Sequence, residues 1–471
     1  MSLFSAISAT TSGLAAETQA INVTGNNIAN LNNPDYADEQ VDISSLGTVQ
    51  TSSGAVSMGV SASVSEDRNA VLDSMVRQED SLTSGFTAQQ SLLNEAQASL
   101  AENIASNSSS SSTDSTATES GLGAAIDDFF NSVESYASDP SDTGEGQALV
   151  QQAGVLTDRF NEIDQNLALV QSNANEIVTN GVSTANTLLG DIATLNSQIN
   201  SLDTSSPGSA LALVDQREGD LEQLAGLVPI TATADAQGEM NVTTTDGSGN
   251  NISLVTGGTV NNTLAFNGTA LTTAGSSPVS LGVSSGSLQG TITASLGPVQ
   301  DLIGSLNSIA QEIVTAVNGA YNPGGTGNDF FDPAGLTAGT IAVDSSLTPS
   351  TLVAGTGAAG DNSLALAVAN VANTSFSTAN GDAIDGTVDE AYASAVSTIG
   401  QALDTANTQV TDQTNVQTII NNERQSVSGV SVDEEMSNLM TYQKAYQASS
   451  EVFQVIDDML TTLIDDISAS G

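Results

Sequence analysis

Carboxylates supply nearly all of the charged side chains in this 471-residue chain. It carries 54 Asp and Glu against six Lys and Arg, and it has neither His nor Cys. Two suitably placed carboxylates are enough to hydrolyse a glycosidic bond, so a carboxylate-only hydrolase is one interpretation of this composition. Ser–His–Asp and Cys–His nucleophiles, and zinc sites built from His and Cys, are excluded because their residues are missing.

Other features of the composition argue against an enzyme. Aromatic residues make up only 3% of the chain, which leaves little with which to build a sugar-binding platform. A calcium-binding secreted adhesin is a second alternative, but Asp382, Asp385 and Asp389 have offsets that do not match a calcium loop, and there is no complete EF-hand. We therefore expect no catalytic residue, no metal site and no cofactor.

The charge of the chain limits its partners. The formal net charge of −48 repels nucleic acid and anionic lipid headgroups. No apolar run approaches the ~18 residues of a membrane span, and the first twenty residues lack the basic start of a secretory signal. We expect no nucleic-acid partner, no membrane insertion, and either a cytoplasmic location or export without a cleaved signal peptide.

Each end of the chain carries one narrow apolar seam of the kind found on a helix. The N-terminal seam recurs every seven residues, at Ile7, Leu14, Ile21 and Ile28. The C-terminal seam recurs at steps of three and four, with Ser449 in its one polar slot, and comprises Leu439, Tyr442, Tyr446, Phe453, Ile456, Leu460, Leu463 and Ile467. A narrow seam must be covered by another helix. The pattern predicts that the two ends pair as a coiled coil and also contact neighbouring subunits, which is typical of a polymer-forming protein.

The pattern between the ends predicts a mainly α fold with β inserts. Alternating residues and turn signals predict a β arm at 36–65 and a β-rich insert at 228–287. The predicted domains are a terminal coiled-coil assembly domain (1–33 with 434–471), a helical bundle domain that includes the arm (34–227 with 288–321 and 389–433), the β-rich insert, and a small Gly/Thr/Asp-rich outer insert (322–388). Because basic residues are so scarce, we expect Arg217 to form a structural ion pair inside the bundle.

Three sequence boxes near the ends carry a family resemblance. Asn-Asn-Ile-Ala-Asn-Leu-Asn-Asn-Pro-Asp-Tyr at 26–36, together with Ser-Gly-Val-Ser-Val-Asp-Glu-Glu at 428–435 and Tyr-Gln-Lys-Ala-Tyr-Gln-Ala at 442–448, resembles motifs of the bacterial flagellar rod, hook and hook-associated axial proteins. The resemblance implies that both terminal helices, with Asn27 in the first box, belong to an assembly interface. It also implies export through the flagellar type III apparatus.

Motifs in the middle of the chain narrow the resemblance. Leu-Val-Asp-Gln-Arg at 213–217, Gly-Ser-Leu-Gln-Gly at 286–290 and Asp-Glu-Ala-Tyr-Ala at 389–393 are similar to motifs of the subunit next to the hook at the hook–filament junction. The implied function is that of an extracellular structural adaptor between hook and filament. The implied partners are further copies in a ring, hook protein on one side, the second junction protein (hook-associated protein 3) on the other, and an export chaperone beforehand. The second junction protein itself and a flagellin-like protein are alternatives within the family.

Overall fold

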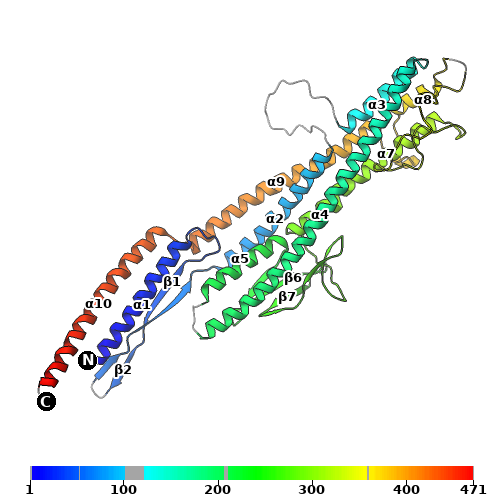
Figure 1. Cartoon of the computed structure of the whole chain (residues 1–471). Helices are drawn as coiled ribbons and strands as arrows, with labels where there is room; N and C mark the ends of the chain where they lie inside the picture. The colour runs from blue at the N-terminus through cyan, green and yellow to red at the C-terminus, as the bar shows by residue number, and fades with distance from the viewer. Residues whose placement is uncertain (1–2, 52–53, 101–120, 206–209, 358–359, 470–471) are drawn as a thin grey trace.

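The computed structural model describes residues 3–51, 54–100, 121–205, 210–357 and 360–469 of the chain. The molecule is long and narrow, and helices run along most of its length (Figure 1). Small antiparallel sheets lie in the middle of the sequence, between the long terminal helices. The predicted fold class, mainly α with β inserts, is confirmed.

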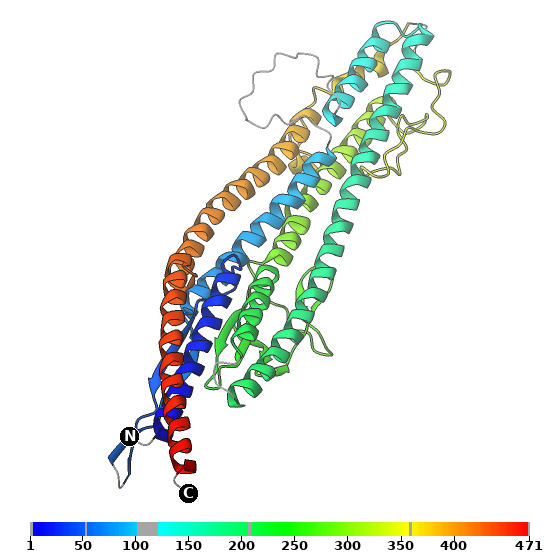
Figure 2. The same cartoon turned by 60° about the vertical axis from the view of Figure 1, so that its left-hand side comes forward.

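The two terminal helices lie side by side at one end of the molecule (Figures 1 and 2). They are α1 (Leu3–Asn30) and α10 (Val432–Ala469), and they run in opposite directions. Beside α1 lies the predicted β arm, made of β1 (Glu39–Ser45) antiparallel to β4 (Val60–Glu66) and extended by β2 (Thr48–Thr51) and β3 (Gly54–Ser57). An isolated two-stranded ribbon is barely stable in water. Packing on α1 therefore supports the arm. The Val60 N–H, for example, donates to Ser12 Oγ at 3.2 Å.

A bundle of long helices makes up the rest of the molecule. The residues 144–203, for which the sequence allowed one helix or two, form part of a single 63-residue helix, α4 (Thr143–Ser205). At 1.5 Å per residue it is about 95 Å long. The other bundle helices are α2 (Ala70–Ser99), α3 (Leu122–Ser138), α5 (Leu211–Leu227), α6 (Ser287–Ala294), α7 (Gln300–Tyr321) and α9 (Val388–Ser428).

Two apolar cores stabilise the bundle at different heights. The core nearer the terminal helices joins the second half of α4 to α5, α6 and the β-rich insert. This insert has a four-stranded antiparallel sheet in the order β5 (Thr231–Ala234), β6 (Met240–Thr245), β7 (Asn251–Thr256), β8 (Thr259–Val260), and a hairpin of β9 (Leu264–Phe266) and β10 (Leu271–Thr273).

The second core lies at the far end and holds the region between α7 and α9. It joins α3, the first half of α4, α7, α8 (Ser363–Val371) and α9. Phe330 and Phe331, which follow α7, pack edge-on against each other and lie 5.7 and 5.6 Å from the ring of Phe129 on α3. These rings fasten a segment with little regular structure, which has α8 and a short 3-10 turn at Thr378–Asn380.

Glycines allow α2 and α6 to cross in backbone contact. The Gly286 N–H donates to the carbonyl of Ser81 at 2.8 Å, and Gly286 has a φ of +87° that favours glycine. A Cβ on Gly290 would lie 2.1 Å from the carbonyl oxygen of Gly85. The motif at 286–290 is thus explained by a helix crossing at which no side chain fits.

Candidate functional site

A heptad row of α10 faces α1. Its members are seven residues apart, at Glu435, Tyr442, Ser449 and Ile456, and all four are buried or half-buried. Ser449 Oγ donates to Glu17 Oε1 at 3.0 Å, so the polar slot of the predicted seam holds a hydrogen bond between the two helices. A single polar pair in an otherwise apolar seam fixes the register of two helices.

The predicted N-terminal seam is only partly covered within one chain. Ile7, Leu14, Ile21 and Ile28 are half-buried, and Glu17, which accepts a hydrogen bond from α10, lies three residues from Leu14 and four from Ile21. Among the side chains of α1 that the structure describes, the buried ones are Ala16, Ala20, Val23, Thr24 and Asn27. Small side chains let the neighbouring elements approach α1 closely at these positions.

The predicted C-terminal seam divides into a covered row and exposed residues. Leu439, Tyr442 and Leu460 are half-buried and Ile456 is 9% exposed, whereas Tyr446, Phe453 and Leu463 are 41%, 36% and 53% exposed. The side chain of Ile467 lies outside the described residues. Within one chain, α1 therefore covers only part of the apolar surface of α10.

The uncovered surface of α10 forms two flanks, one on each side of the row that faces α1. Residues three and four apart on a helix are neighbours. The lysine flank consists of exposed residues at such steps: Lys444, Ala448, Val452, Val455, Met459 and Leu463. The tyrosine flank consists of Tyr446, Phe453 and Ile464, which are exposed on the other side.

Asn27 has an intrachain role, contrary to the expectation that it lies in an assembly interface. It is 0% exposed. Its Nδ2 donates to Asp38 Oδ1 at 2.7 Å and to the Glu39 carbonyl at 2.9 Å, and its Oδ1 accepts from the Tyr36 hydroxyl at 2.7 Å. Asn27 therefore anchors the chain between α1 and β1. A neighbouring subunit cannot reach it, which corrects the sequence-based prediction.

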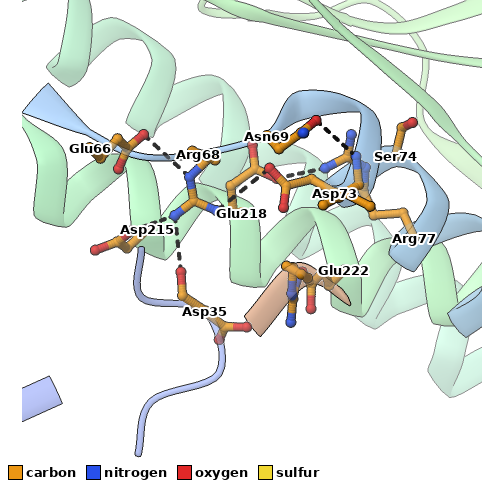
Figure 3. Close-up of polar contacts among 12 residues, drawn as sticks. Asp35, Glu66, Arg68, Asn69, Asp73, Ser74, Arg77, Asp215, Glu218 and Glu222 are labelled. Atoms are coloured by element: carbon orange, nitrogen blue, oxygen red, sulfur yellow. Dashed lines mark hydrogen bonds and ion pairs between the residues drawn. The ribbon is translucent and has the colours of Figure 1, made fainter. Parts of the chain in front are cut away.

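Four of the five arginines gather where the terminal helices meet the bundle, in what we call the arginine cluster: Arg68, Arg77, Arg217 and Arg424. Figure 3 shows Arg68 and Arg77 with the carboxylates around them. Arg68, at the corner between β4 and α2, contacts the carboxylates of Glu66 at 3.3 Å and of Asp215, and donates to the Asp35 carbonyl at 3.0 Å. One guanidinium thus joins the arm, α5 and the loop after α1. This cluster was not predicted from the sequence, although the scarcity of arginine was a signal for it.

Two further arginines extend the cluster. Arg77 Nη1 contacts Glu218 Oε2 at 2.6 Å, and both residues are buried. Arg424, on α9, pairs with Glu222 of α5 and donates to the carbonyl of Pro34 at 3.2 Å. The linkers that leave the terminal pair are therefore held to the bundle by guanidinium groups.

Arg217 does not form the expected ion pair. Its Nη1 donates to Asn196 Oδ1 at 2.9 Å and to the Gly238 carbonyl at 3.1 Å, and no described carboxylate forms a salt bridge with it. Burial lowers the pKa of Arg217, and the charge of Glu218 opposes this shift. The adjacent Glu218 is occupied by Arg77, so Arg217 is free to tie α5 to α4 and the β-rich insert by hydrogen bonds.

A pocket of about 350 Å³ lies beside the cluster, between the two linkers. It is lined by residues 30–37 after α1 and by the last turn of α9 up to Val430. Both family motifs therefore border the same pocket. The two linkers are joined by a backbone hydrogen bond from the Asp38 N–H to the Ser428 carbonyl at 2.9 Å. Together with the polar contacts of the cluster, it connects the terminal pair to the bundle.

Burial raises the pKa values of several carboxyls near the cluster. The pKa is raised to about 6 for Asp38, Asp215 and Asp220, and to about 7 for Glu222. Burial is the largest cause in each case; the charge of Glu435 adds to it at Asp38, and Arg424 opposes it at Glu222. A carboxyl whose pKa is raised by folding stabilises the folded state when protonated, and this contribution is lost as pH rises through the folded pKa.

The melting temperature is therefore expected to rise when pH falls from 8 to about 5.5, since unfolded carboxyls titrate near 4. Carboxyls whose pKa is lowered, such as Asp246 and Asp361, titrate below this window and do not offset the gain. Calorimetry of the chain and of Glu222→Gln measures the effect. The variant should show a smaller rise. A melting temperature that falls steadily from pH 8 to 5.5 would contradict the expected role of these carboxyls.

The described residues contain no group of acidic side chains arranged to hold a metal ion. No helix in the described part of the chain is both long and apolar enough to cross a membrane. In the part of the chain that the structure describes, the functional features are a pair of helices with exposed apolar flanks and a polar joint that connects this pair to a long bundle.

Comparison with known proteins finds matches for both the helix pair and the bundle. Residues 7–36 match the model of flagella basal body rod proteins, and residues 422–466 match the C-terminal model of the flagellar basal body rod FlgEFG proteins. These two matches fall on the terminal helix pair. Residues 110–331 match the helical domain of flagellar hook-associated protein FlgK. The ends of the chain are thus similar to those of flagellar basal body rod proteins.

Relatives cover the chain nearly from end to end. The flagellar hook-associated protein 1 of Bacillus subtilis (strain 168) is 26% identical over 97% of this chain and 97% of its own length. That of Escherichia coli (strain K12) is 26% identical over 96% of this chain and 98% of its own length. A solved hook junction protein FlgK from Burkholderia pseudomallei aligns with a TM-score of 0.46 at 19% identity, over 55% of this chain and 46% of that one. The chain is thus similar to flagellar hook-associated protein 1, a flagellar structural protein, over nearly its whole length, and its middle part matches the helical domain of FlgK.

Proposed function

We propose that this protein forms the junction between hook and filament and acts there as a mechanical adaptor. The observation that carries the proposal is the pair of exposed flanks on α10. They lie on either side of the row that α1 covers, so one copy can contact a neighbour through each. Two different surfaces used in this way give a head-to-tail contact, which closes into a ring or a helical turn.

The proposed partners follow from this arrangement. Further copies bind side by side through the terminal helices, hook protein lies on one side of the ring, and hook-associated protein 3 lies on the other. An export chaperone binds the chain before it leaves the cell through the flagellar apparatus, and the assembled protein is extracellular. The exposed apolar residues of α10 support both steps, because such surface needs cover before and after assembly. The domain division given above fits this function and stays a prediction.

Phe453→Asp is expected to block assembly without unfolding the chain. The side chain is already 36% exposed, so the monomer should keep its melting temperature. In an apolar contact between subunits the new carboxylate would be buried without a partner, which costs several kcal/mol. In a strain whose own gene is deleted, we expect no motility and filament subunits released into the medium.

The control for this experiment is Gln454→Asp, at an exposed position of α10 whose neighbours three and four residues away belong to neither flank. This variant should swim normally. Ile456→Asp, the substitution that the seam alone would suggest, is less informative because Ile456 is covered by α1 within the chain. A motile Phe453→Asp strain with attached filaments would refute the proposed assembly surface.

A further inference from the structure

Lys444 is the one basic residue whose charge the described chain does not use. Arg68, Arg77, Arg159 and Arg424 form salt bridges, and Arg217 is buried with hydrogen bonds. Lys444 is exposed and forms no salt bridge with any described residue. In a chain of 54 acidic residues, the single lysine is thus left unpaired.

The helix around Lys444 offers it no acidic neighbour. Residues three and four positions away on α10 are Met440, Thr441, Gln447 and Ala448, none of which is charged. The next carboxylates along α10 are Glu435 and Glu451, and the nearer of them is about 10 Å away along the helix axis. The ion pairs that usually occupy a helix surface are therefore absent at this position within the described chain.

Lys444 also begins the lysine flank. It is followed at helical steps by Ala448, Val452, Val455, Met459 and Leu463, and each of the four large apolar residues is more than half exposed. A shallow groove of about 390 Å³ lies along the second half of this flank. A positive charge and an apolar stripe therefore share one face of one helix.

We infer that Lys444 binds a carboxylate of a second copy of this chain when the lysine flank is covered. The inference rests on the proposed function and names the polar contact of the same surface. Two copies with a net charge of −48 each repel one another, and salt screens that repulsion only in part. An exposed cation on the contact face replaces local repulsion with attraction, because nearly every charge that a second copy presents is negative.

The single lysine makes the partner directly identifiable. A carbodiimide joins an amine to a carboxylate in contact with it through an amide bond. In an equal mixture of ¹⁵N-labelled and unlabelled full-length protein at high concentration, we expect covalent dimers whose cross-linked peptides join Lys444 of one copy to an Asp or Glu of the other. Lys444 that links only within one copy, or not at all, in protein that does self-associate would overturn the inference.

Sedimentation of matched variants gives the second test. Lys444→Gln and Gln454→Glu each change the net charge by one, but only the first removes the cation, and Gln454 is exposed and ten residues away from Lys444. At about 0.1 M salt, we expect Lys444→Gln to weaken self-association by about fivefold. Gln454→Glu and Lys444→Arg should stay near the wild type. At 1 M salt, where the Debye length is about 3 Å, Lys444→Gln should approach the wild type.

The outcomes separate this inference from the proposed function. If Phe453→Asp abolishes self-association while Lys444→Gln leaves it unchanged, the ion pair is refuted and the assembly surface stands. If Gln454→Glu weakens association as much as Lys444→Gln does, general repulsion explains both and the ion pair is refuted. A wild type that remains monomeric at every concentration and salt would count against the assembly surface itself.

Discussion

Gly290→Ala is expected to lower the free energy of unfolding by about 3 kcal/mol, the upper part of the range for overpacked sites. The new Cβ would lie 2.1 Å from the Gly85 carbonyl oxygen and 2.8 Å from its carbonyl carbon. These are backbone atoms of α2, so no side chain can rotate away to relieve the clash. The two helices would have to separate where α2, α5 and α6 meet. Urea unfolding at constant pH measures the loss as a lower midpoint.

A second glycine provides the matched control. Gly304 is exposed within α7, and a Cβ added there meets nothing within 4 Å. Gly304→Ala should stabilise the chain by roughly 0.5–1 kcal/mol, because alanine loses less backbone entropy in a helix. Equal midpoints for the two variants would show that the crossing of α2 and α6 tolerates a methyl group, contrary to its geometry.

Arg77→Met is expected to destabilise the chain by about 3–5 kcal/mol, the usual loss when one partner of a buried ion pair is removed. Glu218 is 1% exposed and Arg77 Nη1 lies 2.6 Å from its Oε2, so the variant leaves a buried carboxylate without its cation. Arg159→Met removes the surface pair with Glu162, in which the glutamate side chain is 57% exposed. That change should cost less than about 1 kcal/mol.

A double variant tests the cause. Arg77→Met combined with Glu218→Gln removes both charges, and it should recover a large part of the lost stability because a neutral amide is less costly to bury than a carboxylate. The comparison comes from chemical unfolding of the wild type, Arg77→Met, Arg159→Met and the double variant. If the double variant is as unstable as Arg77→Met alone, the loss comes from packing of the arginine side chain and not from the stranded charge.

Periodicity in the sequence was sufficient to predict most of the helices. The seam of α10 and the arm with its alternating residues both correspond to observed elements. These features depend on local secondary-structure propensity and on which face of the element is apolar. Both properties can be read directly from the sequence. The burial of side chains along α1 was less predictable, because Ala16 and Ala20 are covered only when a neighbour approaches closely enough to prefer small residues.

The arginine cluster and the region after α7 could not be predicted in this way. Arg68 and Asp215 are 147 residues apart, and nothing in their local sequence indicates that they meet. Phe330 and Phe331 fasten residues with few helical or strand signals onto Phe129, about 200 positions earlier in the chain. Such contacts depend on the tertiary path of the chain. Asn27 shows the same limit, because its motif was recognised while its partners were not.

The unbroken length of α4 has a consequence for how the subunit carries load. A helix of about 95 Å, packed along both cores, behaves as a rigid lever. The end of α4 nearer the terminal helices lies beside the arginine cluster. The hydrogen bonds of these guanidinium groups can shift between neighbouring oxygens without opening a void. A small change of tilt at the cluster is magnified into a much larger sideways displacement at the far end. In the proposed junction, a curved shaft would place identical subunits at unequal positions, and such displacements would let their terminal helices keep the same contacts.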